Sequence, residues 1–399
     1  MNRRSGSLVL ARGRQARPCD ARERGPQPSG RSPQGFLAPG LALVLACFCS
    51  TACQADRGSS WRVFKAADGL RESLTTAVTV SPRGHVWVKH GEVDAISLSD
   101  GYSIQQIPAP RERNYRVYES RAGKIWSVYE QGLLEFVGDH WQRYPIAEVK
   151  QDHESNPLRQ FRQIPLLPAE QDRVLLLLPD RLLEFRALRS ELTVLREAKD
   201  SQLVKFADFR LADNGEVWLT GSKGLAKLPG PLRQLTATTS WSEHAIPEAL
   251  QVRDLVRPTE NQDGSVTMVG ESLQTERRVL VHFDGTNWLA RGLARESLRF
   301  AWRGEQGGWF WGATLNALLR LYADHEEVVR DAPPAGQYYD VATEPAGVFW
   351  LATLEGLLRY APLAWRTPSE LASLQEVVYS VLEDAQGRLW FAGATGLAV

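Results

Sequence analysis

The sequence predicts an all-β protein, a β-propeller of seven to eight four-stranded blades whose eighth repeat is incomplete. Three observations support this: the composition, a four-residue phrase that recurs along the chain, and a second phrase at a fixed distance behind it. Of the 399 residues 43% are hydrophobic, and the 32 Gly and 22 Pro favour short strands and turns over long helices. Basic and acidic side chains number 47 each, so the charge gives no bias towards nucleic acid or acidic membranes.

Two N-terminal segments precede the repeats. Residues 1–35 are rich in Arg, Gly, Pro and Ser and are predicted to be a disordered leader. Residues 36–53, FLAPGLALVLACFCSTAC, resemble a bacterial export signal, and their last residue, Cys53, ends a possible lipoprotein processing site and is a lipidation candidate. An uncleaved membrane anchor is the alternative, because 18 mostly apolar residues are just long enough to span a bilayer. We expect the folded body, residues 61–399, in the periplasm or otherwise outside the cytoplasm, with membrane contact only through residues 36–53.

The recurring phrase consists of Gly, two variable residues and Trp. It occurs as GHVW, GKIW, GEVW, GWFW, GVFW and GRLW, and DRVL and GSVT are degenerate copies. We call the last residue of each copy its key position. In chain order the key positions are Trp87, Trp126, Leu175, Trp218, Thr267, Trp311, Trp350 and Trp390. Consecutive key positions are 39 to 49 residues apart, which is the length of a four-stranded propeller blade.

The residues around each key position predict the strands of one blade. An apolar strand such as TAVTV (76–80) leads into a turn such as SPRG or ADNG, where Gly takes the positive φ of a tight hairpin. The next strand carries the key residue, whose apolar surface fills the space between adjacent sheets. Six residues later a third strand begins, as in GLLEF at Gly132 and GLLRY at Gly356. A single blade cannot bury its faces alone, so the phrase recurs because each sheet packs on its neighbours around an axis.

The two ends of the repeat region suggest how the ring closes. Trp61 begins WRVF, a fourth strand with no blade before it, and the eighth repeat lacks a fourth strand. We therefore predict that Trp61–Phe64 pairs beside Gly396–Val399 and closes a ring of eight repeats. The alternative is a ring that closes after seven blades, with the eighth unit as the start of a second ring.

The repeat pattern also resembles a known family. A strand, D-x-x-G-x-[VIL]-W and G-L-x-R-[YF] together resemble the two-component regulator propeller repeat, most closely at residues 383–399 and 343–362 and at the junction between blades at 61–87. The resemblance covers roughly residues 61–399. It implies the extracytoplasmic sensor region of a bacterial signalling protein, which usually continues into a histidine kinase or a diguanylate cyclase. No such module follows here, so we expect a fragment of a longer sensor kinase or a chain that signals through a partner.

Catalytic motifs were not found in the sequence. The seven His form no H-x-x-x-H or H-E-x-x-H pair, all four Cys lie at or before Cys53, and no G-x-S-x-G, Walker A or G-x-G-x-x-G phrase occurs. We therefore predict no catalytic residue, metal site or cofactor. Two function classes stay open: a propeller that binds a small molecule, a glycan or a signalling protein, and a propeller-fold lyase or hydrolase acting at the central pocket. A purely structural scaffold is a third interpretation. A cluster of His and carboxylates at one mouth of the axis would favour the enzyme.

Loops that follow the key strands vary in chemistry while the Gly-Trp frame stays constant. Turns of a four-stranded blade alternate between the two faces of the propeller, so these loops share one face with the crossings between blades. Variable polar loops on a rigid frame are a usual place for recognition. We predict that eight residues surround a binding mouth on this face: Lys89, His90, Tyr129, Glu130, Lys223, Glu271, Asn316 and Glu355. The repeated Trp residues are predicted to serve packing.

Overall fold

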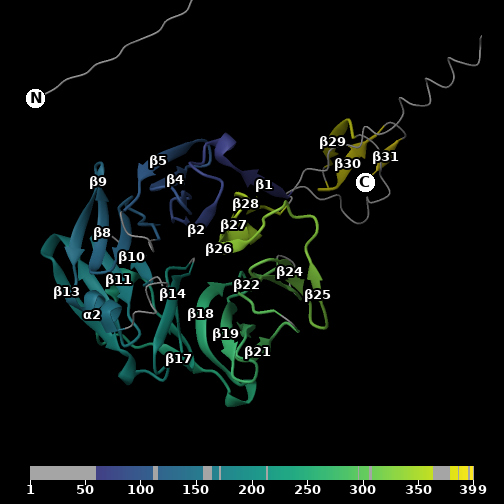
Figure 1. The fold of residues 1–399 in the computed structure, drawn as a ribbon. Helices are drawn as coiled ribbons and strands as arrows, with labels where there is room; N and C mark the ends of the chain where they lie inside the picture. The colour runs from purple at the N-terminus through teal and green to yellow at the C-terminus, as the bar shows by residue number, and fades with distance from the viewer. Residues whose placement is uncertain are drawn as a thin grey trace, which may run out of the picture. The chain divides into compact units, whose positions relative to one another are not determined.

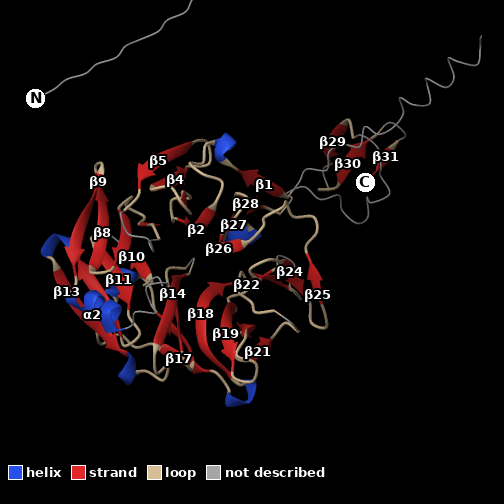
Figure 2. Ribbon diagram, in the orientation of Figure 1, coloured by secondary structure: helices blue, strands red, loops and turns tan. Residues whose placement is uncertain are grey.

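The computed structural model describes residues 60–110, 116–155, 164–169, 172–212, 214–294, 296–304, 308–362, 378–384, 386–393 and 396–398. The predicted leader, 1–35, and the predicted export segment, 36–53, lie outside these residues. Strands dominate the described part of the chain, and its single α-helix is α2 (Ala147–Ser155) (Figure 2). The all-β prediction is therefore confirmed.

Seven four-stranded antiparallel sheets surround a common axis and form a β-propeller (Figure 1). In the first six blades the four strands are consecutive in the chain. The first three blades contain β2 (Thr75–Val80), β3 (Val86–His90), β4 (Ala95–Ser99) and β5 (Ile104–Pro108); β6 (Tyr118–Glu119), β7 (Ile125–Tyr129), β8 (Gly132–Val137) and β9 (His140–Pro145); and β10 (Leu166–Pro168), β11 (Arg173–Leu177), β12 (Arg181–Arg186) and β13 (Glu191–Glu197). The next three contain β14 (Phe206–Leu211), β15 (Val217–Gly221), β16 (Gly224–Leu228) and β17 (Ser242–Ala245); β18 (Val252–Glu260), β19 (Val266–Ser272), β20 (Arg278–Phe283) and β21 (Trp288–Arg291); and β22 (Phe300–Arg303), β23 (Phe310–Ala313), β24 (Leu318–Leu321) and β25 (Glu326–Val328).

Each of the first seven key positions lies in the second strand of its blade, as the repeat predicts. The two degenerate copies obey the same rule, because Leu175 lies in β11 and Thr267 in β19, both buried. In the turns before the key strands, Gly84 and Gly215 have φ values of 80° and 84°, the left-handed region in which glycine is favoured. The repeat phrase therefore corresponds to one hairpin of each blade.

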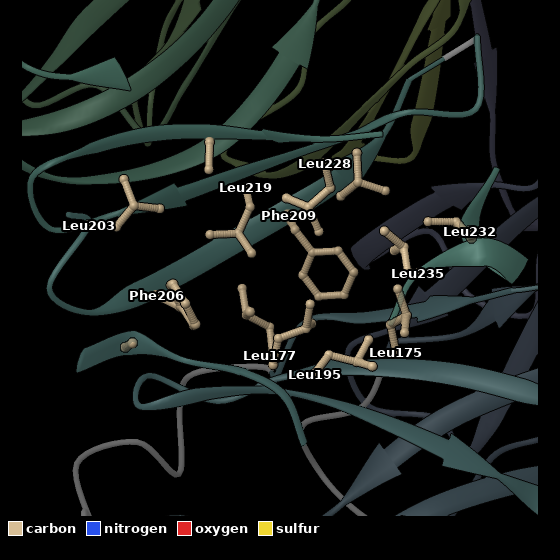
Figure 3. Packing of buried hydrophobic residues seen from close by; sticks show 14 of the residues in the cluster. Leu175, Leu177, Leu195, Leu203, Phe206, Phe209, Leu219, Leu228, Leu232 and Leu235 are labelled. Carbon is tan, nitrogen blue, oxygen red and sulfur yellow. The ribbon is translucent and has the colours of Figure 1, made fainter. Parts of the chain in front are cut away.

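Adjacent blades pack face to face through apolar side chains. Between the third and fourth blades, leucines of β11 and β13 meet Phe206 and Phe209 of β14 and Leu219 of β15 (Figure 3). Burying one such Leu or Phe side chain stabilises the fold by about 1.5–3 kcal/mol. This packing holds neighbouring blades together around the axis.

The seventh blade combines strands from both ends of the ring. Its first three strands are β26 (Tyr338–Thr343), β27 (Phe349–Thr353) and β28 (Leu357–Tyr360), and its outer strand is β1 (Trp61–Phe64). β1 runs antiparallel to β28, with Trp61 opposite Tyr360. The predicted pairing of Trp61–Phe64 beside Gly396–Val399 is therefore wrong, and closure of the ring after seven blades is confirmed, whereas a second ring that starts at the eighth unit stays a prediction.

Aromatic contacts explain why β1 belongs to the seventh blade. The Trp61 ring lies 4.9 Å from the Tyr360 ring, 5.7 Å from Phe349 and 6.3 Å from Trp311, centroid to centroid and edge to face. Trp311 belongs to the sixth blade, so the indole fills the space between the last two blades of the ring. A fourth strand placed beside the eighth repeat would leave this apolar space unfilled.

The eighth repeat forms a sheet of its own. It consists of β29 (Ser380–Glu383), β30 (Leu389–Ala392) and β31 (Leu397–Ala398), and Trp390 occupies its key position in the second strand. Among the described residues, β31 pairs only with β30. The predicted incomplete repeat is therefore present as three strands that are not part of the ring sheets.

Trp61→Ala is expected to lower the free energy of unfolding by about 3–5 kcal/mol, because it removes a buried aromatic side chain from the closing strand. Leu397→Ala in β31 is the matched control, since closure through the eighth repeat would make that position the sensitive one. We expect this control to change stability by less than about 0.5 kcal/mol. Urea unfolding followed by circular dichroism measures both, and equal losses would contradict closure by β1.

Candidate functional site

The first strands of all seven blades surround an axial cavity of about 500 Å³. Its lining includes Ser81 and Gly84, in the turn between β2 and β3, and Pro345, in the turn between β26 and β27. The cavity therefore reaches the face on which the turns between first and second strands lie. An adjoining pocket of about 290 Å³ shares Arg210 and Thr259 with it. A cavity of this size can hold a small molecule.

Four charged side chains, which we call the axial belt, lie at one level of the first strands. In each of these blades, one residue of the first strand pairs with the key position in the second strand. The charged residue stands two positions before that paired residue, and the four are Arg116, Asp208, Arg257 and Asp340. They come from the second, fourth, fifth and seventh blades, so the sign of the charge alternates around the axis. Arg116, Asp208 and Arg257 line the axial cavity.

Asp340 is the centre of the axial belt. Its carboxylate accepts hydrogen bonds from Arg116 Nη2, from Arg257 Nη1 at 3.1 Å and from the backbone N–H of Val78 at 3.0 Å. These donors belong to the second, fifth and first blades, so one carboxylate of the seventh blade binds three other blades. Asp208 adds a link between neighbours, because its carboxylate accepts the backbone N–H of Arg257 at 3.0 Å.

The belt keeps its central ion pair charged although it is buried. Only 2% of the Asp340 side chain is exposed; burial alone would raise its pKa, but Arg116 and Arg257 outweigh burial and lower the pKa. For Arg116, burial alone would lower the pKa, and the Asp340 carboxylate outweighs it and raises the pKa. Burial, together with Asp208 and Asp340, raises the pKa of Tyr118 to about 12 against the opposing effect of Arg116 and Arg257. At neutral pH, Asp340 and Arg116 are therefore ionised and Tyr118 is protonated.

Two arginines of adjacent blades provide the positive charge that is more accessible from the cavity. The Arg257 side chain is 36% exposed, against 20% for Arg116, and its guanidinium lies 4.2 Å from the centre of the Phe300 ring. Arg210 lines both pockets, and its Nη2 donates to the Thr343 carbonyl at 2.9 Å. The remaining wall combines the charged residues Glu119, Arg121 and Glu344 with hydroxyl groups and apolar surface. It includes Tyr118, Thr259, Pro165, Leu167, Pro168, Pro258 and Trp302.

Carboxylates nearer the turns are held by the indoles of key Trp residues. Trp87 Nε1 donates to Glu119 of the next blade at 3.0 Å, and Trp218 Nε1 likewise donates to Glu260 of the next blade. Trp350 Nε1 instead donates to Glu344 of its own blade. Glu119 also contacts Arg83 Nη1 at 2.9 Å and His85 Nδ1 at 2.9 Å. These contacts tie the first blade to the second. The key Trp residues thus hold carboxylates in place by hydrogen bonds, in addition to their packing role.

The described residues do not show the cluster that an enzyme was expected to have. No described His lines either pocket, and Glu119, the carboxylate beside His85, already has three donors. Within the described ranges, no three His, Cys, Asp or Glu side chains gather as a metal site. The cavity lining has an aromatic and polar character instead.

The eight predicted binding residues lie at the other ends of the blades, and none of them lines the axial cavity. His90 and Tyr129 are buried; His90 Nε2 contacts Ser97 Oγ at 2.8 Å, and burial lowers the His90 pKa. Glu271 binds Arg253 at 2.7 Å, and Lys89 is half-buried with a pKa lowered by burial. Four are exposed at or beside the turns between second and third strands: Glu130, Lys223, Asn316 and Glu355. Their role in binding stays a prediction.

The sequence holds a signal for the axial belt that lies outside the recurring phrases. Arg116, Asp208, Arg257 and Asp340 each stand ten positions before the key residue of their own repeat. Aligning the repeats at this position, rather than only at the turns and the key strand, would have placed four charged residues on one level. Each residue alone resembles an ordinary surface charge.

Asp340→Asn is expected to lower the free energy of unfolding at neutral pH by about 3–5 kcal/mol, because it leaves two arginines without their buried counter-charge. The folded pKa of Asp340 is depressed, so its contribution is present above the unfolded value of about 3.9 and is lost as the pH falls through the folded value. The stability gap between wild type and variant should therefore narrow at acidic pH. Urea midpoints across the pH range measure it, with exposed Asp139→Asn as the control. A gap that does not depend on pH would contradict the assigned pairing.

No helix within the described ranges is long and apolar enough to cross a bilayer.

Comparisons with known proteins agree with this architecture. The family described as the two component regulator propeller matches residues 373–395, in the eighth repeat. The search of curated proteins found no match. Among solved structures, the extracellular domain assigned to a one component system of B. thetaiotaomicron has a TM-score of 0.51 at 15% identity, covering 84% of this chain and 45% of that chain.

A streptogramin B lyase has a TM-score of 0.50 at 15% identity, with 75% of this chain and 96% of that chain covered. A catalytically inactive virginiamycin B lyase from Staphylococcus aureus with Quinupristin has a TM-score of 0.50 at 12% identity, with 75% and 98% covered. At such identities the likeness shows the fold alone, and the chain spans less than half the length of the B. thetaiotaomicron domain. The predicted resemblance is confirmed, and the chain is a β-propeller that carries the two component regulator propeller repeat.

Proposed function

We propose that the chain is an extracytoplasmic ligand-sensing propeller of a bacterial signal-transduction system, and that its ligand binds in the axial cavity. The observation that carries the proposal is that all seven first strands contribute to one cavity of about 500 Å³. A ligand there contacts several blades at once. The matched repeat and the fold shared with the extracellular domain assigned to a hybrid two component system of B. thetaiotaomicron support a role in signalling.

The axial belt couples ligand binding in the cavity to the contacts between blades. Arg257 both lines the cavity and binds Asp340, which in turn holds Arg116 and the backbone of Val78. A ligand that draws the Arg257 guanidinium towards itself weakens a contact between the fifth and seventh blades. Binding at the axis is therefore coupled to the relative positions of blades, which a signalling partner can recognise.

The enzyme alternative has weaker support. The lyases share the fold at low identity, and the cavity of this chain has no His among its described lining residues. Its glutamates near the turns are engaged by indole donors. These features fit binding better than proton transfer, because a general base needs an accessible proton acceptor beside the substrate.

Thr259→Trp is expected to abolish ligand binding, because the larger side chain occupies the space that both pockets share. The assay screens a small-molecule library by thermal shift on the full chain and then measures the affinity of each hit by calorimetry. Thr238→Trp, at an exposed position, is the matched control and should retain the hits. Hits lost in both variants or in neither would contradict binding in the axial cavity.

Two further readouts separate the alternatives. Lys223→Ala, on the face of the predicted loop site, should leave the hits unchanged, whereas their loss would move the site to that face. Mass spectrometry of each hit after incubation should recover it intact. Conversion to a product would instead favour the lyase or hydrolase alternative.

Cys53→Ser is expected to release the chain from membranes into the soluble extracytoplasmic fraction, because Cys53 is the proposed lipid attachment point. Cys49→Ser, in the same segment, is the matched control and should stay in the membrane fraction. Retention of both variants would favour residues 36–53 as an uncleaved anchor. Full-length chain in the cytoplasm would reject the extracytoplasmic location.

A further inference from the structure

The axial belt, beside the axial cavity, already holds one bound carboxylate, that of Asp340. Two guanidinium groups and a backbone N–H donate to it. The axial belt is thus a carboxylate-binding site, and its occupant is a carboxylate of the protein itself. Arg257 lies between this occupant and the cavity, because it contacts Asp340 through Nη1 and also lines the cavity.

We infer that the ligand of the axial cavity carries a carboxylate, and that Arg257 and Arg210 bind it. The inference rests on the proposed function, since it names the chemical class of the ligand that this cavity takes. A guanidinium has five N–H donors in a planar fork, so the contact of Arg257 with Asp340 leaves donors that a second carboxylate can use.

Arg210 supplies the second cation. It lies in β14, in the blade next to that of Arg257. It stands two residues after Asp208 of the axial belt and is therefore nearer the turns between first and second strands. The contact of its Nη2 with the Thr343 carbonyl holds the side chain across the pocket wall. A carboxylate that enters from the turns therefore meets positive charge from two adjacent blades.

The surrounding acidic groups favour a single negative charge. Asp340 is paired with two arginines and Glu119 with Arg83, so these two charges are partly compensated, and Glu344, which also lines the cavity, accepts a hydrogen bond from Trp350 Nε1. Asp208 and Asp340 still lie at the level of the belt, and their carboxylates repel a doubly charged group more than a singly charged one. A carboxylate fits this balance better than a phosphate dianion.

The rest of the wall indicates the body of the ligand. Thr259 and Tyr118 offer hydroxyl groups, whereas Pro258 and Trp302 offer apolar surface. A ring of moderate size, hydroxylated or aromatic, can use both. The experiment therefore tests the carboxylate on two different bodies.

Calorimetry on the full chain at constant ionic strength compares two matched series. The first contains D-glucuronate, D-glucose and D-glucose 6-phosphate, which differ only at one carbon of the sugar. The second contains phenylacetate and 2-phenylethanol. In at least one series we expect the carboxylate to bind about tenfold or more tightly than its neutral partner, and the glucuronate more tightly than the phosphate. Neutral partners that bind as tightly as the carboxylates in both series, a phosphate that binds as tightly as glucuronate, or the absence of binding by either carboxylate overturns the inference.

Arg257→Gln and Arg210→Gln should each weaken the carboxylate about tenfold or more and leave the neutral partner unchanged. Arg253→Gln is the matched control, because Arg253 lies in the same strand as Arg257 but binds Glu271. If loss of the Asp340 contact unfolds Arg257→Gln, Arg210→Gln still decides the result. Carboxylate affinity that survives in Arg210→Gln contradicts its assigned role.

The two proposals fail in different ways. A neutral probe that binds wild type but not Thr259→Trp would keep the axial cavity as the ligand site and reject the carboxylate. Carboxylate binding that persists in Thr259→Trp would place an anion site elsewhere and reject the carboxylate inference for this cavity. The library screen judges the cavity independently of these five probes.

Discussion

The pairing of β1 with β28 is the interaction on which the rest of the propeller depends. A blade buries both of its faces only when it has a neighbour on each side, so an open ring would expose two apolar faces. Several contacts stabilise the place where the two ends of the ring meet, which we call the seam. Thr75 Oγ1, in the first blade, donates to the Gly356 carbonyl at 3.1 Å and accepts the Thr353 N–H at 2.9 Å, and Phe64 packs on Trp350 of the seventh blade.

Closure also makes the axial belt possible. Arg116 and Asp340 are 224 residues apart in the chain, and they meet because the ring returns the seventh blade to the second across a narrow axis. Desolvating such charges is costly, and the cost is offset only where the geometry holds them in contact. The apolar packing between blades provides that geometry, while the belt adds specificity to the way opposite blades face each other.

The sequence predicted the local parts of this structure well. The phrase around Trp218 or Trp350 forms one hairpin and its neighbouring strand, so the residues that determine this structure are close together in the sequence. The spacing of the repeats alone was enough to assign Leu175 and Thr267. Ring closure could not be predicted in the same way, because the choice of partner for Trp61 depends on how many blades fit around the axis.

The axial belt was missed for a related reason. Arg116 and Asp340 acquire their meaning from each other, and neither has a local motif that indicates an ion pair across the ring. The loop residues Lys223 and Glu355 could be placed on one face from the turn order, but turn order says nothing of where the blades leave a cavity. That cavity depends on the side chains of seven first strands together.

The seventh blade has a consequence for how the protein is made. β1 is the first strand of the ring to be synthesised and β28 is the last, so the two halves of this blade meet only when the ribosome has finished the ring. Until then Trp61 and the edge of β1 lack their partner strand, and an unpaired edge is prone to aggregation and proteolysis. A chain that ends before β28 therefore leaves β1 unpaired and the seam open, and quality-control proteases can recognise such an incomplete chain.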